Sequence, residues 1–416
     1  MNLRPILSSL RHHKLTAFLL VLQVALTCAI VCNVAFMIAN RVGQLTLPSG
    51  LAEDELSMVH VVGIDKDDNP QVRHATDLAA LRAIQGVHAA VAVDSLPLSR
   101  SDSSYGTCGS RESLDQAMAV RSMQGSSGCV QPSVYSGSEG ELAALGLKLV
   151  AGRDFLPDEY VPAAPGWVVA NVPSAIITRA LAERLYHGDA LGRDLYMGGR
   201  PPMRVVGVVD NLLRPRLRAP SVNQYSVLLP SVPGDSEVTY VLRSAPRDRQ
   251  PVLDAAVDIL GRLEPSRLIP PSSTRTFAQL RQKYFQRDTT MIGLLLASAL
   301  GLLFVTALGI TGLANFWVQQ RTRSIGIRRA IGATRGDILR YFQTENFLIV
   351  GAGIVLGMLL AFLLNAELMQ HYELARLPLF YLPMGALVLW GLGQLAVLGP
   401  ALRAAAVPPV VATRST

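Results

Sequence analysis

Residues capable of chemistry are sparse in this sequence, and none of them has the spacing of a known catalytic motif. A phosphate-binding P-loop requires G-x-x-x-x-G-K-[ST], because its lysine reaches the nucleotide phosphates. None of the four lysines follows a glycine; they are Lys14, Lys66, Lys148 and Lys283. The sequence also has no G-x-S-x-G or H-E-x-x-H motif and no metal-ligand spacing among its 7 histidines. We therefore predict that the chain is not an enzyme and holds no catalytic residue, cofactor or metal.

Two acidic groups are the nearest approach to a cation site. The first is the run 53–55, and the second consists of Asp65, Asp67 and Asp68. Asp65, Asp67 and Asn69 match the start of a calcium loop, but a calcium loop also needs a glycine at its sixth position and a glutamate at its twelfth. The sequence has neither, so we predict that both groups lie in solvated loops.

The cysteines form two pairs of different character. Cys108 and Cys129 lie in Gly/Ser-rich sequence within a long polar region, where a disulfide would form if that region is exported to an oxidising compartment. The alternative is two free thiols. Cys28 and Cys32 lie one helical turn apart in an apolar stretch, and without further ligands they are predicted to be small packing residues.

A basic segment, residues 321–345, is suited to binding another molecule. Thr334 and Asp337 have the spacing of a capping box and follow a turn at 332–333, which predicts a short helix from about Arg335. Three apolar side chains would then be exposed among arginines: Ile338, Leu339 and Phe342. Such a surface could insert into a groove of a partner protein. It could equally lie on anionic lipid, where each arginine contributes about 1 kcal/mol.

The elements that must position these residues are dominated by membrane spans. Half of the 416 residues are hydrophobic and the mean hydropathy is +0.31, which excludes a disordered chain. Four stretches carry no charge: 16–39, 289–320, 346–366 and 377–402. Each is long enough for a helix to cross a hydrocarbon core, which takes about 20 residues. The apolar run of the first stretch is longer than that of a signal peptide, so we predict an uncleaved anchor.

The charge distribution predicts the orientation. The N-terminus, the segment 321–345 and the C-terminal tail together carry 11 Lys or Arg against two acids, whereas residues 41–288 are almost neutral. By the positive-inside rule, the basic segments and both termini are cytoplasmic and the large polar region is outside. The pI of about 9.4 is therefore explained by topology and does not indicate nucleic-acid binding.

The polar region between the first two spans is predicted to be a mixed α/β domain. Residues 41–100 and 235–275 each show a strand–helix–strand pattern, with the final strand near 267–269, and together would form one subdomain. Residues 101–234 would be inserted into it, with strands predicted at 174–178, 203–209 and 225–229 and a helix at 179–186. Their basic cluster 214–218 is predicted to be an ordinary exposed loop in preference to a contact for a partner protein. An amphipathic helix over 277–288 would run into the second span as a stalk.

The third span carries small residues at helical spacing: Gly353, Gly357 and Ala361. Small residues at this spacing allow two helices to approach closely. The neighbour could be another helix of this chain or a second copy, and the sequence leaves both open.

Five segments resemble the MacB/FtsX family of ABC transporter permeases. Residues 321–345 look like the family's signature cytoplasmic loop, and residues 145–155, 190–193 and 204–210 are similar to its periplasmic core. Residues 400–410 resemble the end of these permeases. In one departure, Ser324 stands where family members usually carry a glutamate before Ile-Gly-Ile-Arg-Arg, which affects the expected strength of ATPase docking.

The resemblance implies a membrane protein with four transmembrane helices and a large mixed α/β extracytoplasmic domain between the first and second. The implied segments are a cytoplasmic N-terminus (1–15), spans at 16–39, 346–366 and 377–402, a periplasmic core domain (40–276), a stalk with the second span (277–318), a coupling loop (319–345), a periplasmic loop (367–376) and a cytoplasmic tail (403–416). The residues expected to couple to the ATPase are Arg323, Ile325, Gly326, Arg328, Arg329, Gly332, Ala333, Thr334, Asp337, Ile338, Leu339, Phe342 and Glu345.

The implied function is that of a permease subunit in the bacterial inner membrane. ATP and Mg²⁺ would be bound by a separate ABC ATPase, and a second permease copy or paralogue would complete a dimer. A periplasmic adaptor and an outer-membrane channel are further expected partners, with lipids around the spans and no nucleic acid. The alternative is an FtsX-like signalling subunit that activates a periplasmic enzyme without transport. A membrane-anchored exported enzyme that needs no ATPase is a third interpretation.

Overall fold

The computed structural model describes residues 14–64, 69–120, 128–163, 171–198, 200–372 and 378–406. The chain folds as two compact units, one of Met1–Thr46 with Arg287–Thr416 and one of Leu47–Gln286. We call them the membrane unit and the α/β unit. The acidic residues 65–68, predicted to lie in a solvated loop, are outside the described residues. The run 53–55, predicted likewise, forms a short 3-10 helix, and its half-buried Glu53 and Glu55 form ion pairs with Arg281 and Arg243.

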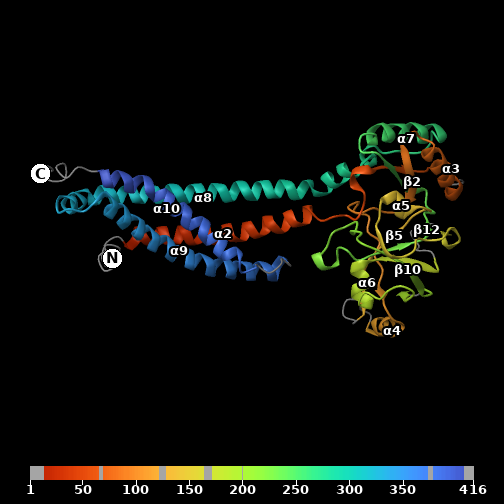
Figure 1. The fold of residues 1–416 in the computed structure, drawn as a ribbon, viewed down its shortest axis with the longest axis horizontal. Coiled ribbons are helices and arrows are strands. Elements are labelled where there is room, and N and C mark those ends of the chain that lie inside the picture. The colour runs from red at the N-terminus through yellow and green to blue at the C-terminus, as the bar shows by residue number, and fades with distance from the viewer. Residues whose placement is uncertain are drawn as a thin grey trace. The chain divides into compact units, whose positions relative to one another are not determined.

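Within the part of the chain that the structure describes, four long helices supply the membrane unit (Figure 1). They are α2 (Lys14–Leu45), α8 (Phe277–Ala330), α9 (Arg335–Tyr372) and α10 (Tyr381–Ala406). All four are long and apolar enough to cross a membrane, which confirms the predicted four-span fold. A helix suits this environment because it satisfies its own backbone hydrogen bonds where no water is present. Helices α2, α8 and α9 extend beyond their uncharged stretches at both ends, since a charged residue marks the edge of the hydrocarbon core and does not end a helix. Helix α10 begins four residues inside its stretch, at Tyr381, and extends beyond the other end to Ala406.

Helices α2, α9 and α10 share an apolar core, which includes Val24, Cys28, Val350, Ile354 and Leu389. Polar groups join α8 to these helices as well. The Oγ1 atoms of Thr27 and Thr306 lie 2.8 Å apart, and Thr311 Oγ1 donates to the carbonyl of Ala396 at 3.1 Å. Arg41 of α2 also forms an ion pair with Asp288 of α8.

One half of the α/β unit is a four-stranded antiparallel sheet in the order β14-β1-β13-β2. Its strands are β1 (Leu56–Val62), β2 (Val87–Val93), β13 (Glu237–Ser244) and β14 (Arg275–Thr276). Helices α3 (Pro70–Arg82) and α7 (Arg249–Leu263) bury their apolar side chains against one face of this sheet. We call this part the first half.

The two predicted strand–helix–strand patterns are present but interleaved, which the sequence did not indicate. Strand β13 of the second pattern lies between β1 and β2 of the first, and pairs antiparallel with both. This is the split β-α-β arrangement of ferredoxin-like folds. The predicted strand near 267–269 is wrong. Only Leu268 there forms a bridge, with Val62, and the true edge strand is β14.

The insertion between β2 and β13, which we call the inserted half, contains an eight-stranded sheet. Seven strands follow the order β4-β3-β9-β10-β8-β11-β5, and β6 also pairs with β10. Their bounds are β3 Thr107–Cys108, β4 Cys129–Val130, β5 Ser133–Ser136, β6 Leu149–Gly152, β8 Ser174–Thr178, β9 Asp194–Met197, β10 Met203–Val209 and β11 Ser226–Leu229. Strands β8, β10 and β11 and the helix after β8 confirm the predicted elements.

Short elements complete the inserted half. Helices α4 (Arg111–Val120) and α6 (Arg179–Tyr186) flank the large sheet, whereas α5 (Glu141–Leu145) contacts β2 and β13 of the first half. Strands β7 (Val161–Pro162) and β12 (Ser231–Val232) form a separate pair. The large sheet and α6 share an apolar core that contains Ile177, Leu181, Val205 and Val227.

Candidate functional site

The end of α8 and the start of α9 form a helical hairpin over residues 321–345, which we call the α8–α9 hairpin. Helix α8 continues to Ala330 and α9 begins at Arg335, so only four residues separate them. Gly332 has a φ of +109°, a backbone conformation that favours glycine. The predicted separate short helix is wrong, because the helix that begins at Arg335 continues without a break to Tyr372.

A capping box fixes the start of α9. Thr334 Oγ1 and the Thr334 backbone N–H donate to Asp337 Oδ2 at 2.6 and 3.0 Å. In return, the Asp337 backbone N–H donates to Thr334 Oγ1 at 3.2 Å. These reciprocal bonds satisfy N–H groups that the first helical turn leaves unpaired. The start of α9 is therefore defined by side-chain hydrogen bonds within its first turn.

Two further contacts hold the hairpin closed. Arg321 Nη1 of α8 donates to Glu345 Oε2 of α9 at 2.7 Å, and the Glu345 side chain is almost fully buried. The Arg328 guanidinium lies 5.1 Å from the centre of the Tyr341 ring, which is cation–π geometry. Because both contacts join the two helices, the hairpin would move as one body.

The apolar surface of the hairpin is not where the sequence placed it. Ile338 and Phe342 were predicted to be exposed, but they are only 4% and 5% exposed and pack with Ile325 in the helix core. Leu339 is half-buried. The exposed apolar side chains are Ile331 at 82% and Ile327 at 46%. The prediction failed because it treated α9 alone, whereas both side chains belong to the apolar core that α9 shares with the other three helices.

The remaining predicted coupling residues surround this tip. Arg323 and Arg328 are exposed, Arg329 and Ala333 are half-buried, and Gly326 is buried. Ser324 is exposed, and its Oγ donates to the carbonyl of Arg321 at 3.0 Å. An open cavity of about 440 Å³ lies beside the tip, lined by Arg328, Ile331, Ala333, Asp337, Ile338, Arg340 and Tyr341.

The small residues of the third span face α2 of the same chain. A Cβ atom on Gly353 would lie 2.8 Å from the Cβ atom of Val24, and one on Gly357 would lie 2.5 Å from the Cβ atom of Cys28. One turn further, Asn33 Nδ2 donates to the carbonyl of Ala361 at 3.2 Å. Of the two neighbours left open by the sequence, the structure therefore places a helix of this chain against the stripe.

Cys108 and Cys129 are joined by a disulfide between the short strands β3 and β4. The bonded pair packs with Leu114 and Ala117 of α4. Cys28 and Cys32 are free thiols buried among the helices. Among the residues that the structure describes, no group of three or more His, Cys, Asp or Glu side chains could hold a metal ion.

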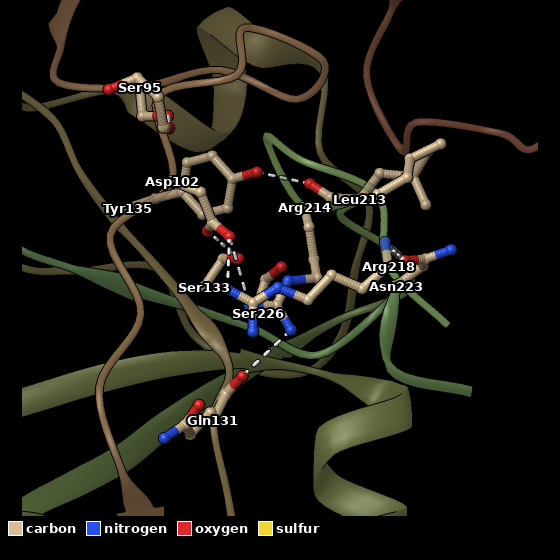
Figure 2. Close-up of polar contacts among 12 residues, drawn as sticks. Ser95, Asp102, Gln131, Ser133, Tyr135, Leu213, Arg214, Arg218, Asn223 and Ser226 are labelled. Atoms are coloured by element: carbon tan, nitrogen blue, oxygen red, sulfur yellow. Dashed lines mark hydrogen bonds and ion pairs between the residues drawn. The ribbon is translucent and has the colours of Figure 1, made fainter. Parts of the chain in front are cut away.

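The basic cluster 214–218 was predicted to be an exposed loop, and for Arg214 this is wrong. Arg214 is 1% exposed, and its Nη2 lies 3.4 Å from Asp102 Oδ2. Its Nη1 donates to the carbonyl of Gln131 at 3.1 Å, as Figure 2 shows. Burial lowers the pKa of the Arg214 guanidinium, and the Asp102 charge opposes that change. Arg218, whose side chain is 43% exposed, lies 3.5 Å from the same carboxylate.

Four membrane-crossing helices, a mixed α/β unit between the first and second, and a capped basic hairpin between the second and third define a multi-span membrane protein built around a large extramembrane domain. Comparison with known families makes this specific. Residues 17–267 match the MacB-like periplasmic core domain, and residues 296–409 match the FtsX-like permease C-terminal domain. The chain belongs to this MacB-like family of ABC transporter permeases.

Similar proteins carry the same family name. The chain is 27% identical to "Macrolide export ATP-binding/permease protein MacB 1/2" of Paracoccus denitrificans (strain Pd 1222), over 99% of this chain and 58% of that protein. It is 37% identical to the MacB protein of Shewanella sp. (strain W3-18-1), over 22% of this chain and 14% of that one. The chain thus spans at most about three-fifths of the length of these relatives. The crystal structure of the periplasmic region of MacB from Actinobacillus actinomycetemcomitans matches with 13% identity and a TM-score of 0.34, covering 58% of this chain and 97% of that one.

Proposed function

We propose that this chain is the permease subunit of an ABC transporter in the bacterial inner membrane, and that a separate ATPase subunit drives it through the α8–α9 hairpin. The hairpin and both termini would be cytoplasmic, and the α/β unit would be periplasmic. The positive-inside distribution of charge supports this orientation, because the hairpin is rich in arginine and the α/β unit is almost neutral.

The exposed Ile331 is the single observation that carries the proposal. It lies in the four-residue turn between two membrane-crossing helices, and covering an isoleucine that is 82% exposed would stabilise a complex with a partner. The arginines around it would be attracted to carboxylates on the partner. Because these neighbouring charges are positive, they favour an acidic partner surface and disfavour a basic one. ATP and Mg²⁺ would be held by that partner. Residues of this chain would bind the partner and transmit its conformational change.

The path of transmission would be α8. It runs as one helix from Phe277 in the α/β unit to Ala330 in the hairpin, a length of about 80 Å at 1.5 Å per residue. A displacement of the hairpin would therefore reach the α/β unit without crossing a loop. Two permease subunits, identical or paralogous, would work with two ATPases, and a periplasmic adaptor with an outer-membrane channel would extend the assembly.

The substrate would be an antibiotic, a peptide or a lipoprotein, exported from the periplasmic side. The name of the Paracoccus relative, a macrolide export protein, supports an export function. No route through the bilayer is needed, since the conformational change is delivered to the extramembrane unit.

The experiment is co-expression and co-purification with candidate ABC ATPase subunits from the same organism, followed by measurement of MgATP hydrolysis in nanodiscs. Ile331→Asp should weaken the complex on the order of 30-fold, because it replaces the burial of one isoleucine, about 2 kcal/mol, with a charge. Ile331→Leu keeps the apolar contact and is the matched control. Undiminished binding by Ile331→Asp would refute docking through the hairpin. An intact ATPase complex that binds a cell-wall hydrolase and transports no substrate would instead identify a signalling subunit.

A further inference from the structure

The first turns of α8 are attached to the first half of the α/β unit. Strand β14 pairs with β1 and leads directly into the helix. The Thr276 N–H donates to Gln279 Oε1 at 2.9 Å, and the Gln279 N–H donates to Thr276 Oγ1 at 3.3 Å. Arg281 Nη1 also forms an ion pair of 2.6 Å with Glu53, just before β1. The base of α8 therefore follows the four-stranded sheet.

One turn later, α8 is also attached to the inserted half, through Tyr284. The Leu217 backbone N–H, in the loop between β10 and β11, donates to the Tyr284 hydroxyl at 2.9 Å. The Arg100 guanidinium lies 5.3 Å from the centre of the Tyr284 ring. Tyr284 is half-buried, whereas its neighbour Lys283 is exposed. The contact is therefore made by the side of α8 that carries Tyr284.

The loop that Tyr284 contacts is held firmly to the sheet behind it. The Arg100 N–H donates to the carbonyl of Pro215 at 3.1 Å, and the buried Arg214–Asp102 ion pair anchors the same loop (Figure 2). Ser133 Oγ of β5 donates to Asp102 Oδ1 at 2.6 Å, which joins the ion pair to the large sheet. A push on this loop would therefore be passed on to β5.

The backbone of the adjoining segment is strained. Leu98 and Arg100 have φ values of 65° and 72°, in the left-handed region that residues other than glycine rarely adopt. Such a conformation persists only where surrounding contacts impose it, and it is concentrated at functional sites. Here the imposing contacts are the bonds to the 214–217 loop and to Tyr284.

We propose that Tyr284 is the residue through which a displacement of α8 is delivered to the inserted half. Helix α8 is then a lever with two attachments: its base moves with the four-stranded sheet, and Tyr284 pushes or pulls the 214–217 loop and the sheet behind it. This inference rests on the proposed function, in which the hairpin end of α8 is driven by an ATPase. Tyr284 is a positioning residue and contacts no substrate.

The first test needs no ATPase. In the full chain in lipid nanodiscs, Tyr284→Phe keeps the ring beside Arg100 and removes only the acceptor of the Leu217 N–H. Hydrogen exchange at residues 216–218 should become about fivefold faster, the effect of losing one ordinary hydrogen bond. Residues 211–213 should not change, because Asn211 Nδ2 and the Leu213 N–H bond independently to the carbonyls of Pro48 and Ser49 at 2.6 and 2.9 Å.

Lys283→Ala is the matched control, since it changes an exposed neighbour on the same turn. Unchanged exchange at 216–218 in Tyr284→Phe would overturn the inference. So would an equal increase throughout the α/β unit, because that result would mean general destabilisation.

The second test uses the ATPase complex with and without a non-hydrolysable ATP analogue. In the unmodified chain, nucleotide should change the exchange of α8 and of residues 214–217. In Tyr284→Phe, it should change α8 alone, with ATPase binding intact. If Tyr284→Phe transmits the change fully, the inference is wrong. If nucleotide leaves α8 unchanged in the unmodified chain, the proposed function fails, while the exchange of 216–218 still decides the Tyr284 contact.

Discussion

The buried ion pair of the inserted half leads to a quantitative prediction about stability. Arg214→Met keeps most of the side-chain volume but removes the charge that faces Asp102, whose own side chain is only 6% exposed. It also removes the donor of the Gln131 carbonyl, at 3.1 Å. The variant therefore leaves a buried carboxylate and a buried carbonyl with fewer partners than before.

The expected loss is about 3 kcal/mol of unfolding free energy. Breaking a buried pair by removing one partner costs about 3–5 kcal/mol, because the other charge is left uncompensated. The lower end applies here, since Arg218 lies 3.5 Å from the same carboxylate and Ser133 still donates to it. Arg218→Met should cost less than about 1 kcal/mol, because its side chain is 43% exposed and screened by water.

The difference in stability between the two variants is measured by thermal unfolding of the full chain in nanodiscs. Proteolysis of the α/β unit reports its unfolding as the temperature rises. For a domain of this size, about 3 kcal/mol corresponds to a decrease in Tm of roughly 6–12 °C. Asp102→Asn combined with Arg214→Met should be less destabilising than the sum of the single changes, by about 2 kcal/mol, since neither charge is then left alone. Equal Tm losses for Arg214→Met and Arg218→Met would refute the assignment of Arg214 as the buried anchor.

Three further predictions concern pH, the disulfide and helix packing. Burial raises the pKa of Glu141 well above its usual value, so the folded state favours the protonated acid and stability falls as pH rises through that raised pKa. Glu141→Gln should therefore reduce the loss of Tm between pH 5 and pH 8, and a Tm–pH curve identical to the unmodified chain would contradict this. Replacing Cys108 and Cys129 by serine should lower stability by about 3 kcal/mol, as measured by Tm, because the disulfide closes a loop with a sequence separation of 21; no change in Tm would show that the bond is absent in solution. Gly357→Ala should reduce the yield of folded protein in detergent, since its Cβ would lie 2.5 Å from the facing helix, whereas Gly351→Ala meets nothing within 4 Å and should be tolerated; similar yields would argue against that helix contact.

Much of the fold could be predicted because its signals are local in sequence. A charge-free stretch of about 20 residues indicates a span wherever it occurs, and the alternation of apolar residues indicates a strand. Strands β8 and β10 and helix α6 accordingly have the predicted bounds. The interleaving of β13 between β1 and β2 could not be predicted in this way, because it depends on which strands pair across an insertion of more than a hundred residues.

The candidate site was predictable only in part, for the same reason. The capping box at Thr334 and Asp337 is a matter of spacing within one turn, and it forms as predicted. Which side of α9 is exposed depends instead on the other helices, because Ile338 belongs to the core that all four helices share, while Ile331 in the preceding turn stays exposed. Ile327 and Ile331, four residues apart among arginines, were the signal in the sequence that could have indicated this tip.

The sequence by itself determined the class of protein: four membrane spans, their order around a large polar domain, and a basic segment between the second and third. These properties follow from composition over short windows. Placing a charge in hydrocarbon is so costly that charge-free stretches mark the spans, however the helices pack. Only the tertiary structure decided burial. It buried Arg214, which a basic cluster had suggested was exposed, because the Asp102 carboxylate and the Gln131 carbonyl lie far away in sequence yet supply the partners that a buried charge requires.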